Sequence, residues 1–218
     1  MPIIVGPEIE TYLYQILPSR DPVLSHMEDQ ARKRGIPIVG PTVGRFLHFL
    51  ALLHKPKKIY EMGSAIGYST IWWAKAAGPD GEVHYTDGNP DNEKEAKQYF
   101  KQAGVEKIVK THVGNALQII DELPGEFDLI FCDIDKNGYP EAFHKAYPRL
   151  KKGGLLVADN VLWSGTVALP SKAPVDTHGG RKWVEAVKEF NRLIYETPGL
   201  FTTIIPLRDG VSVSLKLK

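Results

Sequence analysis

The sequence is poor in the residues on which disulfide frameworks and zinc sites depend. Cys132 is its one cysteine, so an internal disulfide and a cysteine-rich zinc site are both excluded. Its seven histidines include no H-x-x-x-H pair, the spacing that places two zinc ligands on one helical face. Because disulfides belong to oxidising compartments, the near-absence of cysteine predicts a cytoplasmic protein.

Long apolar runs and an excess of one charge are missing as well. The net charge is +1 over 218 residues, so no overall field draws the chain to nucleic acid or to an anionic membrane surface. No apolar stretch approaches the roughly 18 residues that a membrane span needs. The N-terminal segment has no basic start and soon reaches Glu8 and Glu10, which argues against a secretory leader. We expect one globular domain over residues 1–218.

Short apolar runs alternate with helical patterns along most of the chain. Five of them predict strands, at Lys58–Met62, Glu82–Thr86, Ile108–Val113, Phe127–Asp133 and Gly154–Asp159. Apolar strands between helices are typical of a parallel sheet covered on both faces. The last two runs, Phe201–Leu207 and Val211–Leu217, meet at an Asp-Gly turn and predict an antiparallel hairpin at one edge. The fold class is therefore α/β, with a doubly wound, mostly parallel sheet.

Two helical stripes and one long loop complete this pattern. The stripes predict amphipathic helices that pack on the sheet, through Val43, Phe46, Leu47, Leu50 and Leu53 and through Trp183, Val187, Phe190 and Ile194. Residues 164–182 are rich in Gly and Pro and predict a surface loop. Long loops of this kind often form lids or binding loops.

A glycine-bearing turn follows the first strand of the predicted sheet. Gly63 and Gly67 have G-x-x-x-G spacing, which differs from the G-x-G-x-x-G of a dinucleotide site. Glu61 at the strand end would repel a pyrophosphate but tolerate a cationic ligand with an amino-acid group. Asp87 ends the next strand, where a carboxylate can accept hydrogen bonds from both ribose hydroxyls. Together they predict a nucleoside cofactor at the carboxyl ends of the strands, the alternative being an ordinary βα turn.

Polar residues also end the fourth and fifth strands. Asp133 follows one, and Asp159 and Asn160 follow the other, so they should converge at one sheet edge. Two carboxylates and an amide oxygen form an all-oxygen set suited to Mg²⁺. The alternative is that both Asp side chains only cap the following helices. Asp135 and Lys136 could likewise form an exposed ion pair.

With these residues placed, the sequence resembles the cation-dependent O-methyltransferases, the family of catechol and caffeoyl-coenzyme A O-methyltransferases. The likeness extends from about Ile36 to Lys218. Its motifs stand at Glu61–Ser69, Asp87, Asp133–Tyr139, Gly153–Trp163 and Pro206–Gly210. It implies an S-adenosylmethionine-dependent enzyme with a seven-stranded Rossmann-like sheet. It also implies a homodimer, and residues 1–40 would form a helical extension on the substrate side.

The resemblance assigns roles to individual residues. Those expected to bind S-adenosyl-L-methionine are Glu61, Gly63, Ser64, Ser69, Asp87, Ala116, Asp133 and Asp135. The expected ligands of Mg²⁺, or of Mn²⁺ or Ca²⁺ in its place, are Asp133, Asp159 and Asn160. Lys136 would be the general base, because a lysine can lose its proton where an arginine cannot. The acceptor would lie against Lys136, Asn160, Trp163 and Ser164.

The acceptor itself is less closely defined. Plant enzymes of the family that act on coenzyme A esters have Asn where this chain has Ser164, and the N-terminal region lacks a basic cluster for coenzyme A phosphates. Both departures favour a small catechol-type phenol. The alternative is a hydroxylated uridine in tRNA, although Lys172, Arg181 and Lys182 are few for a phosphate-tracking surface. A nicotinamide-dependent oxidoreductase is disfavoured by the glycine spacing and by the absence of a Tyr-x-x-x-Lys pair.

Overall fold

The computed structural model of the chain describes residues 4–218. Its seven strands form one sheet in the order β3-β2-β1-β4-β5-β7-β6. The pairs β1–β2, β2–β3 and β4–β5 are parallel, whereas β7 runs antiparallel to both β5 and β6. The predicted fold class and the C-terminal hairpin at a sheet edge are therefore confirmed. Within residues 4–218, no helix is long and apolar enough to cross a membrane.

The chain divides into two compact units. The first is Thr11–Leu123, and the second is Pro124–Lys218 together with the N-terminal end up to Glu10. Helix α1 (Pro7–Gln15) contains the division. The prediction of a single domain with a helical extension at residues 1–40 stays a prediction, and residues 1–3 of that extension lie outside the described residues.

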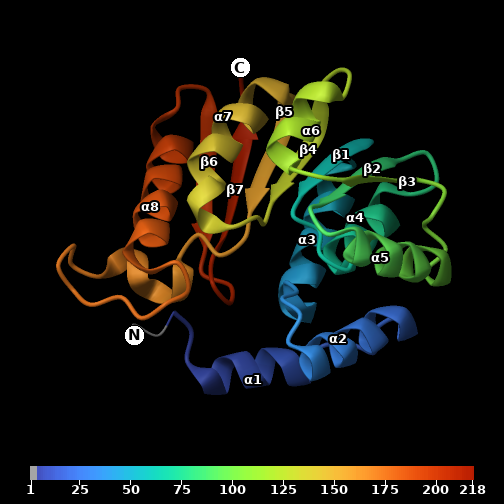
Figure 1. The fold of residues 1–218 in the computed structure, drawn as a ribbon, viewed down its shortest axis with the longest axis horizontal. Helices are drawn as coiled ribbons and strands as arrows, with labels where there is room; N and C mark the ends of the chain where they lie inside the picture. The colour runs from blue at the N-terminus through green and yellow to red at the C-terminus, as the bar shows by residue number, and fades with distance from the viewer. Residues whose placement is uncertain (1–3) are drawn as a thin grey trace. The chain divides into compact units, whose positions relative to one another are not determined.

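The first unit contains three of the strands and the helices around them (Figure 1). Its elements are α2 (Pro22–Arg34), α3 (Gly40–His54), β1 (Lys58–Met62), α4 (Tyr68–Ala77), β2 (Glu82–Asp87), α5 (Pro90–Gln102), β3 (Val109–Val113) and α6 (Ala116–Glu122). Helix α5 is capped at its start: the Asn89 side chain accepts from the Asp91 N–H, and Pro90 occupies the first turn.

Helices cover both faces of the strands in this unit. Tyr85 of β2 packs edge-on against Phe100 of α5, with ring centroids 5.8 Å apart. Tyr60 of β1, on the opposite face, donates a 2.6 Å hydrogen bond to the Ala116 carbonyl of α6. Because side chains alternate along a strand, these contacts place α5 and α6 on opposite faces, as in a doubly wound sheet.

The second unit carries the other four strands. Its elements are β4 (Phe127–Cys132), the 3₁₀ turn η1 (Lys136–Gly138), α7 (Tyr139–Arg149), β5 (Leu150–Ala158), the 3₁₀ turn η2 (Trp163–Ala168), α8 (Gly180–Glu196), β6 (Leu200–Ile205) and β7 (Val211–Lys216). Helices α7 and α8 lie side by side (Figure 1), where Phe190 meets Tyr139 with ring centroids 5.1 Å apart. Val187, Phe190 and Ile194 of the predicted α8 stripe are buried.

Two details of the sequence prediction are wrong. The α3 stripe was expected to bury Leu53, but this side chain is 66% exposed, beside exposed Phe49 and Leu52. The buried face runs through Val43 and Leu47, as predicted, and through Ala51, and Leu53 lies off that line.

The loop expected over residues 164–182 is shorter than predicted. Residues up to Ala168 belong to η2, and α8 already begins at Gly180. Two of the three glycines that indicated a loop, Gly179 and Gly180, stand at the start of this helix. Gly179 caps it with φ +74°, and a Cβ there would lie 2.1 Å from the Trp183 ring. Packing of Trp183 thus requires glycine at this helix start.

Candidate active site

The predicted site residues fall into two groups, one in each unit. Glu61 is the centre of the group in the first unit and is fully buried at the end of β1. Its Oε2 accepts a 2.7 Å hydrogen bond from Ser64 and a second bond from the Thr70 hydroxyl at the start of α4. Its backbone carbonyl accepts a 2.6 Å bond from Thr86 of β2. Glu61 therefore joins β1, β2, α4 and the glycine-bearing turn.

Asp87 holds the same turn from the end of β2. Its Oδ2 accepts from the Ala65 N–H at 3.0 Å, and its Oδ1 accepts from the Asn89 N–H at 2.8 Å and from the Asn92 amide at 3.0 Å. A carboxylate has about four acceptor positions, so these three bonds leave about one position for a ligand. Asp87 thus shapes the turn directly, beyond the ribose contact predicted for it.

The other predicted residues of this group are placed around the turn. Gly63 and Gly67 have φ of +80° and +84°, which favour glycine, and a Cβ at Gly67 would lie 2.5 Å from Phe100. Ser69 is buried in the first turn of α4, and Ala116 begins α6. Sequence reasoning missed Thr70 and Thr86, because hydroxyls inside apolar segments carry no signal of their partner.

The second group lies at the ends of β4 and β5, where Cys132 and Ala158 are paired in register. Asp159 is fully buried. Burial, and then the neighbouring Asp133 carboxylate, raise the pKa of Asp159 to about 7. Its Oδ1 is buried with no hydrogen-bond partner among residues 4–218. The predicted convergence of Asp133 and Asp159 is thus present, and it leaves a buried acceptor atom unsatisfied.

Lys136 is almost fully buried beside these carboxylates. Its Nζ lies 3.0 Å from Asp133 Oδ1, 3.1 Å from the Ile134 carbonyl and 2.8 Å from the Tyr139 hydroxyl. Tyr139 in turn donates a 2.8 Å bond to the Asp159 carbonyl. Three contacts match the three N–H donors of an ammonium group. The alternative of an exposed Lys136–Asp135 pair is therefore wrong, since Lys136 is paired with Asp133.

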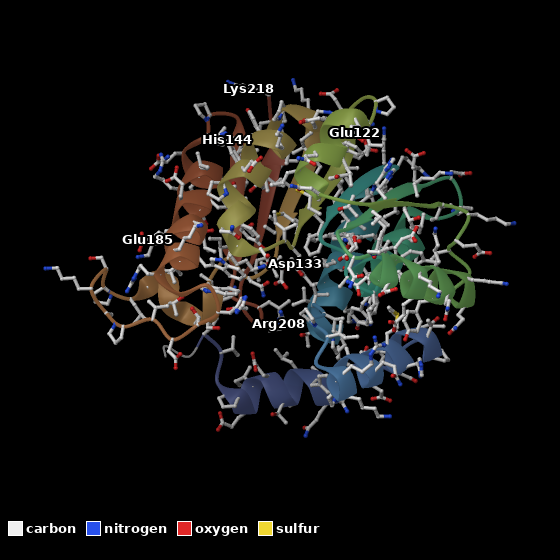
Figure 2. The ribbon with its side chains drawn as sticks, viewed as in Figure 1. Glu122, Asp133, His144, Glu185, Arg208 and Lys218 are labelled. Atoms are coloured by element: carbon white, nitrogen blue, oxygen red, sulfur yellow. The ribbon has the colours of Figure 1, made fainter. Side chains whose placement is uncertain are left out.

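The turn between β6 and β7 belongs to the predicted motif Pro206–Gly210 and supplies two residues to which the sequence analysis assigned no role. Asp209 accepts a hydrogen bond from the Ser164 N–H, and burial raises the pKa of its carboxyl. Arg208 lies with its Nη2 3.4 Å from Asp159 Oδ2, and Figure 2 shows Arg208 and Asp133 toward the same end of this unit. Asp-Gly is a common hairpin turn, so a structural role was a sufficient explanation of Asp209.

Backbone strain is concentrated in the two groups. Six non-glycine residues among those described have positive φ. Asn160, Trp163, Ser164 and Arg208 belong to the second group, Ala65 belongs to the first, and Lys55 alone is remote, at the end of α3. Left-handed backbone costs about 1–2 kcal/mol for such residues and persists where surrounding structure imposes it. Positive φ outside glycine is thus concentrated in the segments that hold the predicted site residues.

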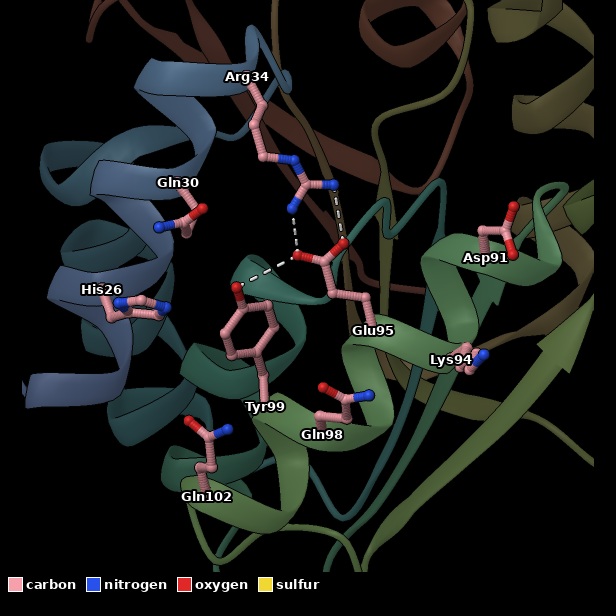
Figure 3. Close-up of a pocket in the computed structure, with 9 residues that line it drawn as sticks. All are labelled: His26, Gln30, Arg34, Asp91, Lys94, Glu95, Gln98, Tyr99 and Gln102. Carbon is pink, nitrogen blue, oxygen red and sulfur yellow. Dashed lines mark hydrogen bonds and ion pairs between the residues drawn. The ribbon is translucent and has the colours of Figure 1, made fainter.

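A polar groove of about 450 Å³ in the first unit is distinct from these groups (Figure 3). Arg34 of α2 and Glu95 of α5 join across it in a two-bond ion pair, at 2.6 and 2.9 Å. Tyr99 donates to the same Glu95 carboxylate at 3.2 Å. The remaining lining residues are His26, Gln30, Asp91, Lys94, Gln98 and Gln102. None of the predicted site residues lines this groove.

The second group suits a hard cation by its chemistry. Within residues 4–218, no three His, Cys, Asp or Glu side chains gather as a metal-ligand group. The predicted set instead combines two carboxylates, Asp133 and Asp159, with the amide of Asn160. Oxygen donors of this kind, completed by water or substrate, are what Mg²⁺ takes in proteins. The unsatisfied Oδ1 of Asp159 is the observation that fits such a ligand.

Known proteins resemble this chain over nearly its whole length. A family model described as O-methyltransferase matches residues 20–217. A catechol O-methyltransferase of Niastella koreensis is 31% identical over 218 residues, covering 95% of this chain and 96% of the relative. A caffeoyl-CoA O-methyltransferase of Medicago sativa is 31% identical, covering 80% and 73%.

Among solved structures, the O-methyltransferase TomG from Streptomyces achromogenes, determined in complex with SAM, is 30% identical with a TM-score of 0.84. The alignment covers 97% of this chain and 96% of TomG. The family resemblance and the enzyme class predicted from the motifs, an S-adenosylmethionine-dependent O-methyltransferase, are confirmed. The chain belongs to the O-methyltransferase family.

Proposed function

We propose that this enzyme transfers the methyl group of S-adenosylmethionine to a hydroxyl of a vicinal dihydroxy phenol, with a divalent cation at Asp133, Asp159 and Asn160. The observation that carries the proposal is the fully buried Asp159 carboxylate, whose Oδ1 lacks a partner among the described residues while Asp133 lies beside it. Two adjacent carboxylates repel each other unless a proton or a cation intervenes. A divalent cation held by both carboxylates would offset this repulsion and would satisfy Asp159 Oδ1.

The cofactor half of the proposal rests on the first unit. Glu61, Ser64 and Asp87 are assembled around the glycine-bearing turn at the carboxyl ends of β1 and β2, where open α/β sheets bind ligands. The SAM-bound TomG structure supports the same cofactor here. The similarity of this chain to the catechol O-methyltransferase of Niastella koreensis and to the caffeoyl-CoA O-methyltransferase of Medicago sativa supports a catechol-type acceptor.

A bound divalent cation supplies positive charge that makes an acceptor hydroxyl easier to deprotonate and fixes its orientation. Lys136 then holds the proton removed from that hydroxyl at Nζ. To accept it, Lys136 must first give up one of its three ammonium protons to solvent, and with that proton one of its three contacts. The contact with Asp133 is the one lost, since Asp133 would face the cation. Tyr139, anchored on the Asp159 carbonyl, keeps Nζ in place.

The acceptor class predicts a sharp difference between catechol and phenol. Catechol offers two adjacent oxygens to the cation, whereas phenol offers one and would be neither oriented nor activated. We expect methylation of catechol and no detectable turnover of phenol, measured by transfer of a labelled methyl group with Mg²⁺ present. Undermodified tRNA serves as the third acceptor in the same assay. Equal turnover of catechol and phenol would contradict two-point binding. Methylation of tRNA alone would show that the acceptor is tRNA and not a vicinal dihydroxy phenol.

Asp87→Ala is expected to weaken cofactor binding by about 1.5–3 kcal/mol, the typical loss for hydrogen bonds to a charged group. The variant loses both a ribose contact and the bonds that hold the Ala65 and Asn89 N–H groups. Calorimetric titration with S-adenosylmethionine measures the change. Asp80→Ala, in the exposed turn before β2, is the control and should bind normally. Unchanged affinity in Asp87→Ala would remove Asp87 from the cofactor site.

A further inference from the structure

One cationic side chain of the second group has no part in the proposed chemistry. Arg208 lies at the β6–β7 turn with its Nη2 3.4 Å from Asp159 Oδ2, a long contact for an ion pair. Its side chain is 38% exposed, while Asp159 is fully buried. Arg208 therefore stands between a proposed cation ligand and the solvent from which an acceptor arrives.

The backbone around Arg208 is fixed. The Val161 N–H donates to the Gly210 carbonyl and the Leu162 N–H to the Asp209 carbonyl, each at 3.0 Å. A Cβ at Gly210 would lie 2.4 Å from Leu162, so the turn is pressed against the segment that follows β5. Arg208 itself has φ +51°. A costly conformation held by neighbouring hydrogen bonds is characteristic of a side chain that must point in one direction.

We propose that Arg208 is a specificity-determining residue that selects acceptors carrying a carboxylate close to their hydroxyls. This inference rests on the proposed function, because Arg208 is placed relative to the acceptor through Asp159. The planar guanidinium presents paired N–H donors that match the two oxygens of a carboxylate. Arg208 contacts Asp159, which is proposed to hold the cation that binds the acceptor hydroxyls. A carboxylate that pairs with Arg208 must therefore be attached near the dihydroxy ring.

The test compares protocatechuate, whose carboxylate is attached directly to the dihydroxyphenyl ring, with the matching dihydroxybenzyl alcohol, which is neutral. For the wild type we expect kcat/KM to favour the acid by about 10- to 100-fold, the size of one or two charge-assisted hydrogen bonds. Calorimetric binding of both compounds, with S-adenosylhomocysteine present, should show the same preference in Kd. Arg208→Gln should abolish the preference by weakening the acid alone.

Two further variants complete the experiment. Arg208→Lys keeps the positive charge without the paired N–H donors of the guanidinium, and it should retain part of the preference for the acid. Arg192→Gln removes an exposed arginine of α8 that pairs with Glu189 and Glu196, and it should leave the preference unchanged. Each preference is the ratio of two kcat/KM values measured on one protein sample. A smaller folded fraction in a less stable variant lowers both values equally and cancels in the ratio.

The outcomes separate this inference from the proposed function. Equal treatment of acid and alcohol by the wild type would overturn the role of Arg208 while methylation of catechol still upheld the proposed function. If Arg208→Gln lowers kcat/KM for the acid and for the alcohol by the same factor, the role of Arg208 in acceptor selection is also overturned. Arg208 would then be a partner of Asp159 only. Failure to methylate catechol itself would instead refute the proposed function.

Discussion

Asn in place of Asp159 is expected to abolish methyl transfer while leaving cofactor affinity near that of the wild type. The substitution keeps the shape of the side chain but removes the buried charge that the cation requires. Loss of a residue that hydrogen-bonds to a metal ligand already lowers metal affinity by about 10- to 100-fold. Loss of the ligand itself should therefore lower it by more than about 100-fold. Calorimetric titration with Mg²⁺ and with S-adenosylmethionine measures the two affinities separately.

Asp128→Asn provides the matched control for this experiment. Asp128 lies on β4 in the same unit and pairs with Lys151 at 2.6 Å, and it is not part of the second group. Its replacement should leave both affinities and the rate close to wild type, because a partly exposed ion pair contributes little. An Asp159→Asn enzyme that still transfers methyl groups at the wild-type rate would show that Asp159 is only a structural residue.

Lys136→Ala should lower the rate of transfer by about 10²–10⁴-fold, the usual contribution of a general base. Affinities for Mg²⁺ and for the cofactor should change little, because Lys136 contacts the proposed ligands only through Asp133. Single-turnover measurement with saturating cofactor and catechol isolates this step from binding.

The Lys136→Arg variant shows whether Lys136 acts as a general base or only as a fixed positive charge. Arginine keeps the charge beside Asp133 but cannot release a proton near neutral pH. If Lys136 removes the proton from the acceptor, the Arg variant should be as slow as the Ala variant. Recovery of activity in Lys136→Arg would instead assign Lys136 an electrostatic role.

Strand positions and strand-end carboxylates could be predicted from the sequence because both follow from local patterns. Apolar runs fixed β1 at Lys58–Met62, and neighbouring parallel strands necessarily bring their carboxyl ends together. Asp133 and Asp159 therefore converge as the sequence indicated. Leu53 was misplaced because a helical stripe specifies a face only to within one or two positions.

The contribution of the β6–β7 turn could not be predicted in the same way. Arg208 reaches Asp159 across 49 positions of sequence, through a turn whose place depends on strand order and on the close packing of Gly210 against Leu162. The positive φ of Asn160, Trp163 and Ser164 is equally invisible in the sequence, since none of these residue types requires it. Both features arise from tertiary contacts.

Removal and restoration of the cation test the central claim most directly. Enzyme stripped with EDTA and dialysed at pH 8, above the pKa of about 7 that burial gives Asp159, should bind S-adenosylmethionine but fail to methylate catechol. Added Mg²⁺ should restore the activity of the wild type and not that of Asp159→Asn. Full activity of the stripped wild-type enzyme would contradict the account and would remove the proposed cation roles of Asp133, Asp159 and Asn160 together.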